Sequence, residues 1–283
     1  MIIKDAILQY SNELNYISDS PRLDIELLIR KVLGDVDKLY IHLNLNKELN
    51  SEEKNKLIDM VDQRKKGRPI AYILGTREFM GLDFNVCEGV LIPRPDTEIL
   101  VEEVINLCKD VKNPVILDIG TGSGAISISL AKYITHSKVY SFDISDIALE
   151  TGKVNAINNN VEHKISFVKS DLFDSIKDKN IVFDVIVSNP PYIRKKDIPT
   201  LHTQVKDYEP YIALEGGEDG LDFYKKITKE SVNYIKANGI LAYEVGHDQA
   251  IDVKDIMIQN GYHNITIKED LSGIDRVVIG HKI

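Results

Sequence analysis

Residues 115–124 read Val-Ile-Leu-Asp-Ile-Gly-Thr-Gly-Ser-Gly, an apolar run that passes directly into a glycine-rich turn. The apolar run predicts a buried strand, and the pattern of Ala125–Tyr133 predicts a helix straight after the turn. Glycines at positions 120, 122 and 124 let the backbone bend sharply and let a ligand approach main-chain atoms that a Cβ would block. This stretch therefore predicts a strand–turn–helix unit with a ligand site at the turn.

Short apolar runs and helical stretches alternate along the chain after this turn. The expected strands are Val115–Ile119, Lys138–Asp143, Lys164–Lys169, Val182–Ser188 and Gly239–Glu244. The expected helices are Ala125–Tyr133, Asp146–Asn158 and Leu221–Lys236. Strands separated by helices of this length indicate right-handed crossovers and a mainly parallel sheet, so we predict the α/β class.

The end of the chain breaks this alternation. His263–Lys268 and Arg276–Gly280 have the composition of strands, and Asp270–Asp275 joins them with no helical stretch between. Two strands joined by a short turn pair antiparallel. We therefore expect a C-terminal antiparallel hairpin to close the sheet.

The part of the chain before residue 93 has a different pattern. Residues 1–74 read as helices joined by short polar turns, which predicts a small helical domain. Residues 75–92 then change period, because Glu78–Val86 resembles two short strands that turn near Gly81. We expect a helical domain over 1–74, a β-hairpin linker over 75–92 and an α/β domain over 93–283.

The composition is that of a globular protein. The 283 residues are 43% hydrophobic and 28% charged, and no apolar run approaches the ~20 residues that a membrane span needs. The N-terminus lacks the basic and apolar regions of a signal peptide. Two cysteines and seven histidines without paired spacing predict neither a disulfide framework nor a metal site. We therefore expect a cytoplasmic protein with no bound metal and no membrane association.

The charge balance argues against a nucleic-acid partner. The chain has 35 Lys+Arg against 44 Asp+Glu, a formal net charge of −9. Residues 1–85 carry 13 basic and 14 acidic side chains, so the remaining 22 basic and 30 acidic residues hold nearly all of the excess. Binding long nucleic acid by phosphate neutralisation needs a basic surface, so we expect no direct nucleic-acid contact.

Asp143 ends the strand that follows the glycine turn, about 20 residues on, where an acidic side chain accepts hydrogen bonds from ribose hydroxyls. The glycine spacing departs from the dinucleotide fingerprint, because Ser127 stands where its last Gly or Ala would be. Asp118 would repel a pyrophosphate but could hold the ammonium of a methionine tail, which favours S-adenosyl-L-methionine. A nicotinamide-dependent oxidoreductase and a purely structural corner remain as alternatives.

Asn189-Pro190-Pro191-Tyr192 follows the expected strand Val182–Ser188. Consecutive prolines remove two N–H donors, so the turn presents acceptors, among them the Asn189 amide oxygen and the Pro190 carbonyl. Such a pair would hold both hydrogens of a planar NH₂ group, and Tyr192 offers a flat face beside it. Aiming that nitrogen at a methyl donor would supply much of the rate by orientation. The alternative interpretation is an ordinary proline-stiffened loop.

Together these motifs resemble class I S-adenosylmethionine-dependent methyltransferases, in particular the PrmC/HemK glutamine N5-methyltransferases of peptide chain release factors. The likeness covers nearly the whole chain. Besides Asn189–Tyr192, it rests on Gly75–Phe79, on Leu91–Glu98, and on a downstream block formed by Tyr208-Glu209-Pro210, Ala213-Leu214 and Gly217–Leu221. Enzymes that methylate a glutamine of a ribosomal protein share much of this pattern, and adenine-N6 methyltransferases share the Asn-Pro-Pro-Tyr turn. Both stay open as alternatives, as does a non-catalytic binding module.

The resemblance implies a seven-stranded methyltransferase sheet behind a helical domain that recognises the protein substrate. It implies methyl transfer to the glutamine of the release factor's Gly-Gly-Gln loop, with S-adenosyl-L-homocysteine as product, and we expect a monomer. The residues that it places at the cofactor are Gly120, Thr121, Gly122, Ser123, Gly124, Asp143, Leu172 and Asn189. It assigns glutamine binding to Asn189, Pro190, Pro191 and Tyr192, with Asn189, Pro190 and Tyr192 as catalytic residues.

Other polar residues carry less specific expectations. Asp96 precedes Thr97-Glu98 and an apolar helix pattern, which predicts an N-cap. Arg94, held between prolines, is expected to contact substrate or cofactor or to be structural, and Glu244 either faces the site or satisfies backbone amides. The charged stretch 194–208 is interpreted as a lid or partner-docking loop, or as a solvated crossover.

Overall fold

The computed structural model describes residues 1–283 and divides into two compact units. One unit contains Met1–Gly75 together with His202–Tyr208, and the other contains Thr76–Leu201 and Glu209–Ile283. We call them the helical unit and the catalytic unit. No helix in either unit has both the length and the apolar character needed to cross a membrane.

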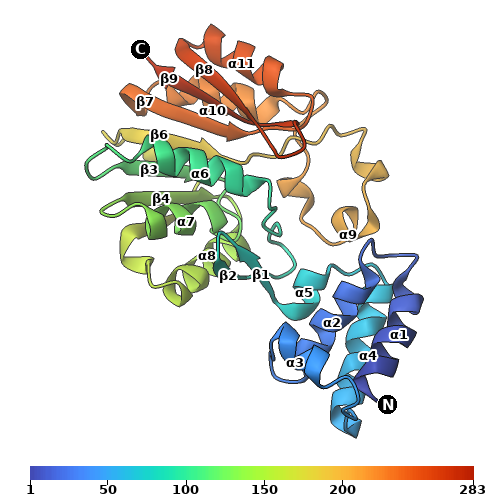
Figure 1. The fold of residues 1–283 in the computed structure, drawn as a ribbon. Helices are drawn as coiled ribbons and strands as arrows, with labels where there is room; N and C mark the ends of the chain where they lie inside the picture. The colour runs from blue at the N-terminus through green and yellow to red at the C-terminus, as the bar shows by residue number, and fades with distance from the viewer. The chain divides into compact units, whose positions relative to one another are not determined.

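The catalytic unit is built on one seven-stranded sheet (Figure 1). Its strands are β3 (Val115–Ile119), β4 (Lys138–Asp143), β5 (Ile165–Lys169), β6 (Phe183–Ser188), β7 (Ile235–Glu244), β8 (Tyr262–Glu269) and β9 (Asp275–Lys282). Their spatial order is β5-β4-β3-β6-β7-β9-β8, and β9 alone runs antiparallel to the other six strands. The predicted α/β class, the seven strands and the C-terminal hairpin are confirmed.

Helices cover both faces of this sheet (Figure 1). The helices α6 (Thr97–Leu107), α7 (Ala125–Tyr133) and α8 (Asp146–Asn158) supply the core on one face, whereas α10 (Asp222–Ser231) and α11 (Ala250–Gln259) supply it on the other. The central strands read as continuous apolar runs because parallel strands are buried on both faces. Ile116 and Leu117 of β3, for example, point into opposite clusters, and both are fully buried.

The chain order of the strands reverses at β3. From β3 the chain moves outward to β4 and β5 on one side, and then returns to place β6 on the other side of β3. In open α/β sheets, ligands bind outside the carboxyl ends of the strands at such a switch point. The glycine turn after β3 and the Asn189 turn after β6 are thereby neighbours.

The predicted helix Leu221–Lys236 is wrong at its C-terminal end. The helix stops at Ser231, and Ile235 already pairs with Phe183 as the first residue of β7. The register between β6 and β7 then shifts near Asn238, whose φ is +61°, so Asn238-Gly239 forms a bulge within the strand. In the sequence, Asn238-Gly239 has the character of a strand boundary. The strand begins earlier, at Ile235, because Ile235 pairs with Phe183 of β6.

The helical unit packs five helices around its own apolar core. They are α1 (Ile3–Leu14), α2 (Pro21–Val32), α3 (Lys38–Leu43), α4 (Ser51–Lys65) and α5 (Ile70–Leu74). The start of α4 is a capping box, in which Asn50 accepts from the Glu53 amide while Glu53 accepts from the Asn50 amide. A buried ion pair, Arg64 Nε to Asp24 Oδ2 at 2.8 Å, joins α4 to α2.

The stretch 202–208, part of the expected lid or docking loop, is grouped with the helical unit. It contains α9 (Thr203–Lys206), and Gln204 accepts a hydrogen bond from the buried Arg64 at 3.3 Å. The Tyr208 hydroxyl donates to the Lys66 carbonyl at 2.9 Å. The segment is therefore ordered by contacts with the helices, while its behaviour as a lid stays a prediction.

Single-turn 3-10 helices complete the fold. They lie at Glu162–Lys164, Asp174–Ile176, Ile198–Thr200 and Tyr211–Ala213. A separate hairpin, β1 (Thr76–Phe79) and β2 (Leu82–Asn85), pairs in the antiparallel register expected from its sequence. It is grouped with the catalytic unit, and the three-part division 1–74, 75–92 and 93–283 stays a prediction.

Asn155 of α8 connects the hairpin to the glycine turn. Its side-chain oxygen accepts from the Asn85 amide at 2.7 Å, and its nitrogen donates to the carbonyls of Asn85 at 3.0 Å and Ser123 at 2.9 Å. The residue is completely buried. One side chain therefore makes hydrogen bonds to three backbone groups.

Replacing Asn155 by alanine is expected to lower the free energy of unfolding by about 2 to 4 kcal/mol, because buried backbone groups lose their partners. Urea unfolding followed by circular dichroism measures this loss. Lys153→Ala, on the exposed side of the same helix, is the matched control and should change stability by less than about 0.5 kcal/mol. An equally small effect of Asn155→Ala would contradict the bridging role.

Candidate active site

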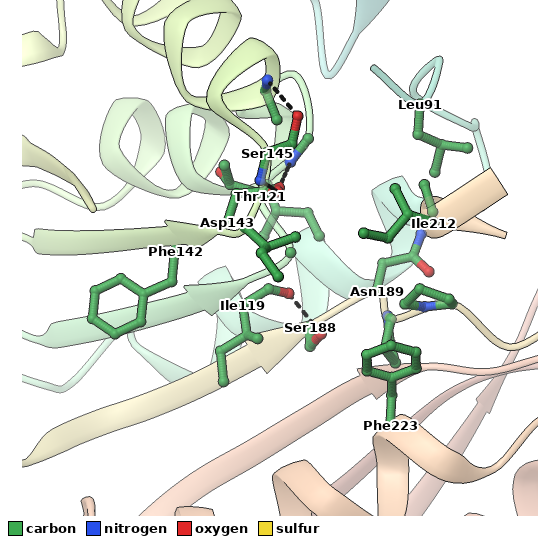
Figure 2. Close-up of a pocket in the computed structure, with 18 of the residues that line it drawn as sticks. Leu91, Ile119, Thr121, Phe142, Asp143, Ser145, Ser188, Asn189, Ile212 and Phe223 are labelled. Atoms are coloured by element: carbon green, nitrogen blue, oxygen red, sulfur yellow. Dashed lines mark hydrogen bonds between the residues drawn. The ribbon is translucent and has the colours of Figure 1, made fainter. Parts of the chain in front are cut away.

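A cavity of about 350 Å³ opens at the carboxyl ends of the central strands, entirely within the catalytic unit. Figure 2 shows Asp143 and Ser145 on one side of it, and Asn189, Ile212 and Phe223 on the other. This volume falls in the range of cofactor and small-molecule sites. The pocket therefore lies where the switch point predicts a ligand.

The glycine turn forms one wall of the pocket, and its conformation explains its composition. Gly120, Gly122 and Gly124 have φ values of +79°, +55° and +83°, which side chains disfavour. A Cβ at Gly120 or Gly122 would meet no atom within 4 Å, so both positions face open space. A Cβ at Gly124 would lie 3.3 Å from the Gly152 Cα, so this glycine permits close packing of α7 against α8.

The predicted cofactor residues gather around this turn. Among the residues lining the pocket are Gly120, Thr121, Gly122, Ser123, Asp143, Leu172 and Asn189. Gly124, the N-cap of α7, does not line the pocket, although Ser123 and Ala125 on either side of it do. Leu172 reaches the pocket with a φ of +47°, held by a hydrogen bond from the Ser170 hydroxyl to its carbonyl at 2.9 Å. Strained backbone at a non-glycine residue is typical of binding sites.

Asp143 lies at the end of β4 with each carboxylate oxygen held by one backbone amide. Gly122 donates to Oδ2 and Ser145 donates to Oδ1, both at 2.9 Å. Burial raises the pKa of Asp143, and the amide hydrogen bonds oppose this shift. Since a carboxylate oxygen has two lone pairs, each oxygen keeps one for a further donor. The two hydroxyls of a ribose match this arrangement.

Asp118 does not line the pocket, so the expected direct contact with a ligand's ammonium is wrong. The side chain lies behind the glycine turn, where its Oδ2 accepts from the hydroxyls of Ser127 at 2.6 Å and Thr121 at 3.2 Å. Burial raises its pKa to about 6. Its neighbour in sequence, Ile119, reaches the pocket because side chains of a strand alternate between faces.

The turn after β6 faces the glycine turn across the pocket. Asn189, Pro190 and Pro191 line it, and the Ser188 hydroxyl ties this strand end to β3 by donating to the Ile119 carbonyl at 2.7 Å. The Asn189 Nδ2 donates to Thr97 Oγ1 at 3.2 Å. The amide nitrogen is thus engaged, which leaves the Asn189 oxygen as an acceptor.

Tyr192 is the member of this motif that the pocket lining omits. Its ring packs against the core formed with α10 and α11, and burial raises the pKa of its hydroxyl. The buried Gln249 donates to the Tyr192 carbonyl at 3.0 Å, which supports the turn from behind. A substrate contact by Tyr192 stays a prediction.

The residues before α6 take roles that the sequence left open. Arg94 lines the pocket and pairs with the buried Glu209, Nη2 to Oε1, at 2.6 Å. Asp96 occupies the predicted N-cap position of α6, but its side chain accepts no capping hydrogen bond. It forms an ion pair with Arg276 at 3.0 Å instead, because β9 brings that guanidinium alongside.

Sequence reasoning missed several lining residues. They include Thr97, Phe142, Ser145, Ile212 and Phe223. Phe142 and Ser145 flank Asp143, and Thr97 belongs to a quoted motif, so adjacency could have found these three. Ile212 and Phe223 come from a connection and a helix far along the chain, and no local signal marks them.

The residues present fit S-adenosylmethionine. The Asp143 carboxylate has spare acceptor positions for ribose hydroxyls, and the glycine turn leaves room that a Cβ would fill. Arg94, one of the cations in the lining, is already paired with Glu209. The pocket lining thus offers no unpaired guanidinium for a pyrophosphate.

The chain matches two family descriptions: methyltransferase small domain over residues 95–207, and PrmC N-terminal domain over residues 5–75. It is 44% identical over 284 residues to the release factor glutamine methyltransferase of Clostridium botulinum, covering 100% of both chains. The enzyme of the same description from Clostridium acetobutylicum is 42% identical, with 99% of this chain and 98% of that one covered.

The crystal structure of a methyltransferase from Pyrococcus furiosus superimposes with a TM-score of 0.54 at 22% identity, over 72% of this chain and 90% of that chain. At this identity the likeness supports the shared fold alone. The shared fold is the α/β fold of the catalytic unit.

The buried Asp118 should make stability depend on pH. The unfolded chain releases this proton near the ordinary pKa of 3.8, and the folded chain near 6. Between these values the folded state binds more protons, so its stabilising contribution falls as pH rises, by on the order of 3 kcal/mol. Urea unfolding at several pH values should show a shallower fall in Asp118→Asn than in the wild type, because the buried Glu244, whose pKa is also raised, contributes a fall to both. An exposed control, Asp110→Asn, should keep the wild-type slope, and an undiminished slope in Asp118→Asn would refute the assignment.

Proposed function

Because this chain belongs to the release factor glutamine methyltransferases, we propose that it transfers a methyl group from S-adenosylmethionine to a release factor. The acceptor is the side-chain N5 of the glutamine in the Gly-Gly-Gln motif. The observation that carries this proposal is the Asn189-Pro190 turn, which lines the same pocket as the glycine turn and Asp143. One pocket thus offers places for both reactants.

The cofactor side of the pocket is formed by the glycine turn and Asp143. S-adenosylmethionine supplies an electrophilic methyl group on a sulfonium. Asp143 would accept from the ribose hydroxyls, Gly120–Ser123 would lie along the methionine end, and Leu172 would pack on the adenine. The carboxylate stays in place because Gly122 and Ser145 hold it from both sides.

The substrate side is the Asn189 turn. The Asn189 Oδ1 and the Pro190 carbonyl would accept the two hydrogens of the glutamine amide, which fixes the direction of its nitrogen. An amide nitrogen is a poor nucleophile, since its lone pair is delocalised, so orientation supplies much of the rate. The bond from the methyl carbon to sulfur would break as its bond to nitrogen forms, with S-adenosylhomocysteine as the leaving group, and the nitrogen, made acidic by the methyl group, would give its proton to water. No general base among the side chains is required.

The rival substrates are separated by charge and by assay. An adenine-N6 methyltransferase needs a basic groove, whereas the chain after residue 85 carries a net charge of −8 from 22 basic and 30 acidic residues. A glutamine of a ribosomal protein offers the same amide chemistry and remains the second candidate. A nicotinamide-dependent activity lacks support, because the glycine spacing departs from the dinucleotide fingerprint at Ser127.

We assign recognition of the protein substrate to the helical unit. Leu39 and Leu43 of α3 are 61% and 74% exposed, and residues four apart lie on one face of a helix. Contiguous exposed apolar patches mark sites of protein contact, and this pair of leucines is our candidate for such a patch. With a substrate from translation, we place the reaction in the cytoplasm and expect the enzyme to act as a monomer.

Incubation with a release factor and S-adenosylmethionine should add one methyl to the Gly-Gly-Gln glutamine, read by peptide mass spectrometry. Asn189→Ala should lower kcat by about 100-fold or more, because the amide nitrogen loses an orienting acceptor. Asp143→Ala should weaken S-adenosylhomocysteine binding by about 10- to 100-fold in calorimetry. Asp110→Ala, an exposed aspartate, should change neither quantity.

The design also tests the rivals. Methylation of DNA or of a ribosomal protein in preference to the release factor would overturn the assigned substrate. Binding of NAD in place of S-adenosylhomocysteine would overturn the cofactor. Normal turnover by Asn189→Ala would show that the turn does not hold the glutamine.

The double substitution Leu39→Asp, Leu43→Asp should raise KM for the release factor by about tenfold, because two apolar contacts are lost and charge is introduced. The Kd for S-adenosylhomocysteine should not change. Leu271→Asp, at a fully exposed leucine of the catalytic unit, is the matched control. Equal KM values for the double variant and the control would locate substrate recognition elsewhere.

A further inference from the structure

Glu244 is a buried carboxylate for which the proposed chemistry has no role. It ends β7 and is 2% exposed. Burying an acidic side chain is costly unless specific partners repay it, so its partners indicate why it is there. The closest of them is Thr97, which lines the pocket. Thr97 and Glu244 lie 147 positions apart in the sequence.

The contacts form a chain that ends in the active site. The Thr97 hydroxyl donates to Glu244 Oε2 at 2.5 Å, and the Asn189 Nδ2 donates to Thr97 Oγ1 at 3.2 Å. Asn189 also lies close enough to Glu244 to lower the pKa of its carboxyl. Three elements, β6, β7 and the start of α6, are thereby joined at one polar cluster.

The direction of these hydrogen bonds follows from the number of protons available. A hydroxyl has one hydrogen, and a carboxylate can only accept, so Glu244 takes the Thr97 hydrogen. The Thr97 oxygen is then left to accept, and it can accept only from the NH₂ end of Asn189. The Asn189 oxygen is consequently turned away from Thr97 and remains available.

We propose that Glu244 and Thr97 are positioning residues that hold the Asn189 amide with its oxygen directed at the substrate amide. The inference rests on the proposed role of Asn189 and extends it. A free asparagine amide can present either its oxygen or its nitrogen, and only the oxygen can accept a hydrogen from the glutamine. Thr97 and Glu244 exclude the orientation in which the Asn189 nitrogen would face the substrate, and they do so before the substrate binds.

The charged and titratable groups around Glu244 come from several elements. Asp96 at the start of α6 raises the pKa of Glu244, and Arg276 of β9 lowers it. Arg276 is itself held by Asp96 at 3.0 Å and Asp270 at 2.9 Å. The Tyr224 hydroxyl donates to the Glu244 main-chain carbonyl at 2.9 Å, which fixes the end of β7.

Tyr192 and Arg94 complete the surroundings, and both lie near enough for charge interactions within this cluster. Burial is the largest influence on Glu244 and raises its pKa to about 7, with the hydrogen bond from Thr97 and the nearby Asn189 opposing it. When Glu244 Oε2 is protonated it can donate its own hydrogen to Thr97 Oγ1, and the Thr97 hydroxyl is then free to donate to the oxygen of Asn189. The orienting effect therefore belongs to the ionised form and weakens as pH falls below about 7.

Kinetics with matched variants test the relay. Thr97→Val keeps the shape but removes the hydroxyl, so kcat should fall by about 10- to 100-fold while KM for the release factor changes by less than about threefold. Thr97→Ser restores the hydroxyl and should recover most of the rate. The amide oxygen of Glu244→Gln still accepts from Thr97 but the group does not ionise, so its kcat should lack the decline toward acid pH that we expect of the wild type.

A measurement on the protein without substrate is independent of activity. Side-chain amide signals of ¹⁵N-asparagine should include one pair, assigned to Asn189 by its loss in Asn189→Ala, that shifts with the titration of Glu244. The shift should be absent in Glu244→Gln, and the pair should exchange faster with water in Thr97→Val. Unchanged binding of S-adenosylhomocysteine shows that each variant is folded.

The outcomes separate this inference from the proposed function. Wild-type methylation of the release factor with an unaltered kcat in Thr97→Val would overturn the relay and leave the function intact. Absence of methylation by the wild type would overturn the function, and the asparagine signals would still report whether the relay exists. An Asn189 signal that is the same in the wild type, in Glu244→Gln and in Thr97→Val would by itself overturn the relay.

Discussion

The pairing of β3 with β4 on one side and β6 on the other is the constraint on which the rest of the structure depends. These parallel ladders bring the carboxyl ends of three strands to one edge of the sheet. Each end carries one component of the site: the glycine turn, Asp143 and Asn189. A slip of one residue in either ladder would exchange inward and outward side chains and dismantle the pocket.

Around this edge the protein buries acidic groups and compensates each one differently. Asp143 receives backbone amides, Asp118 receives two hydroxyls, and Glu209 receives the guanidinium of Arg94. In each case burial raises the pKa, and the hydrogen bonds limit the rise. Asp118 Oδ1 and Glu209 Oε2 are buried without a hydrogen-bond partner, so the compensation of these two carboxyls is partial, whereas both oxygens of Asp143 accept from an amide.

Much of the catalytic sheet could be predicted because its signals are local. The strands β3 and β4 match their predicted bounds, since apolar runs between turn residues are sufficient to define them. The end of α10 and the bulge at Asn238 could not be predicted, because pairing with β6 decides them. The sequence around Asp96 likewise predicts a capping side chain. In the structure that side chain forms an ion pair with Arg276, which is distant in sequence, and makes no capping hydrogen bond. The roles assigned to the site residues remain proposals, although most of those residues line one pocket.

The sequence by itself determined the strand–turn–helix unit, the three glycines with positive φ and the family to which the chain belongs, because each depends on residues close together in the chain. Only the tertiary structure decided what surrounds Asn189. Thr97 and Glu244 come from opposite ends of the catalytic unit and meet it through the packing of α6 and β7 against β6. No pattern of local spacing encodes such a contact, since its partners become neighbours only after the sheet has formed.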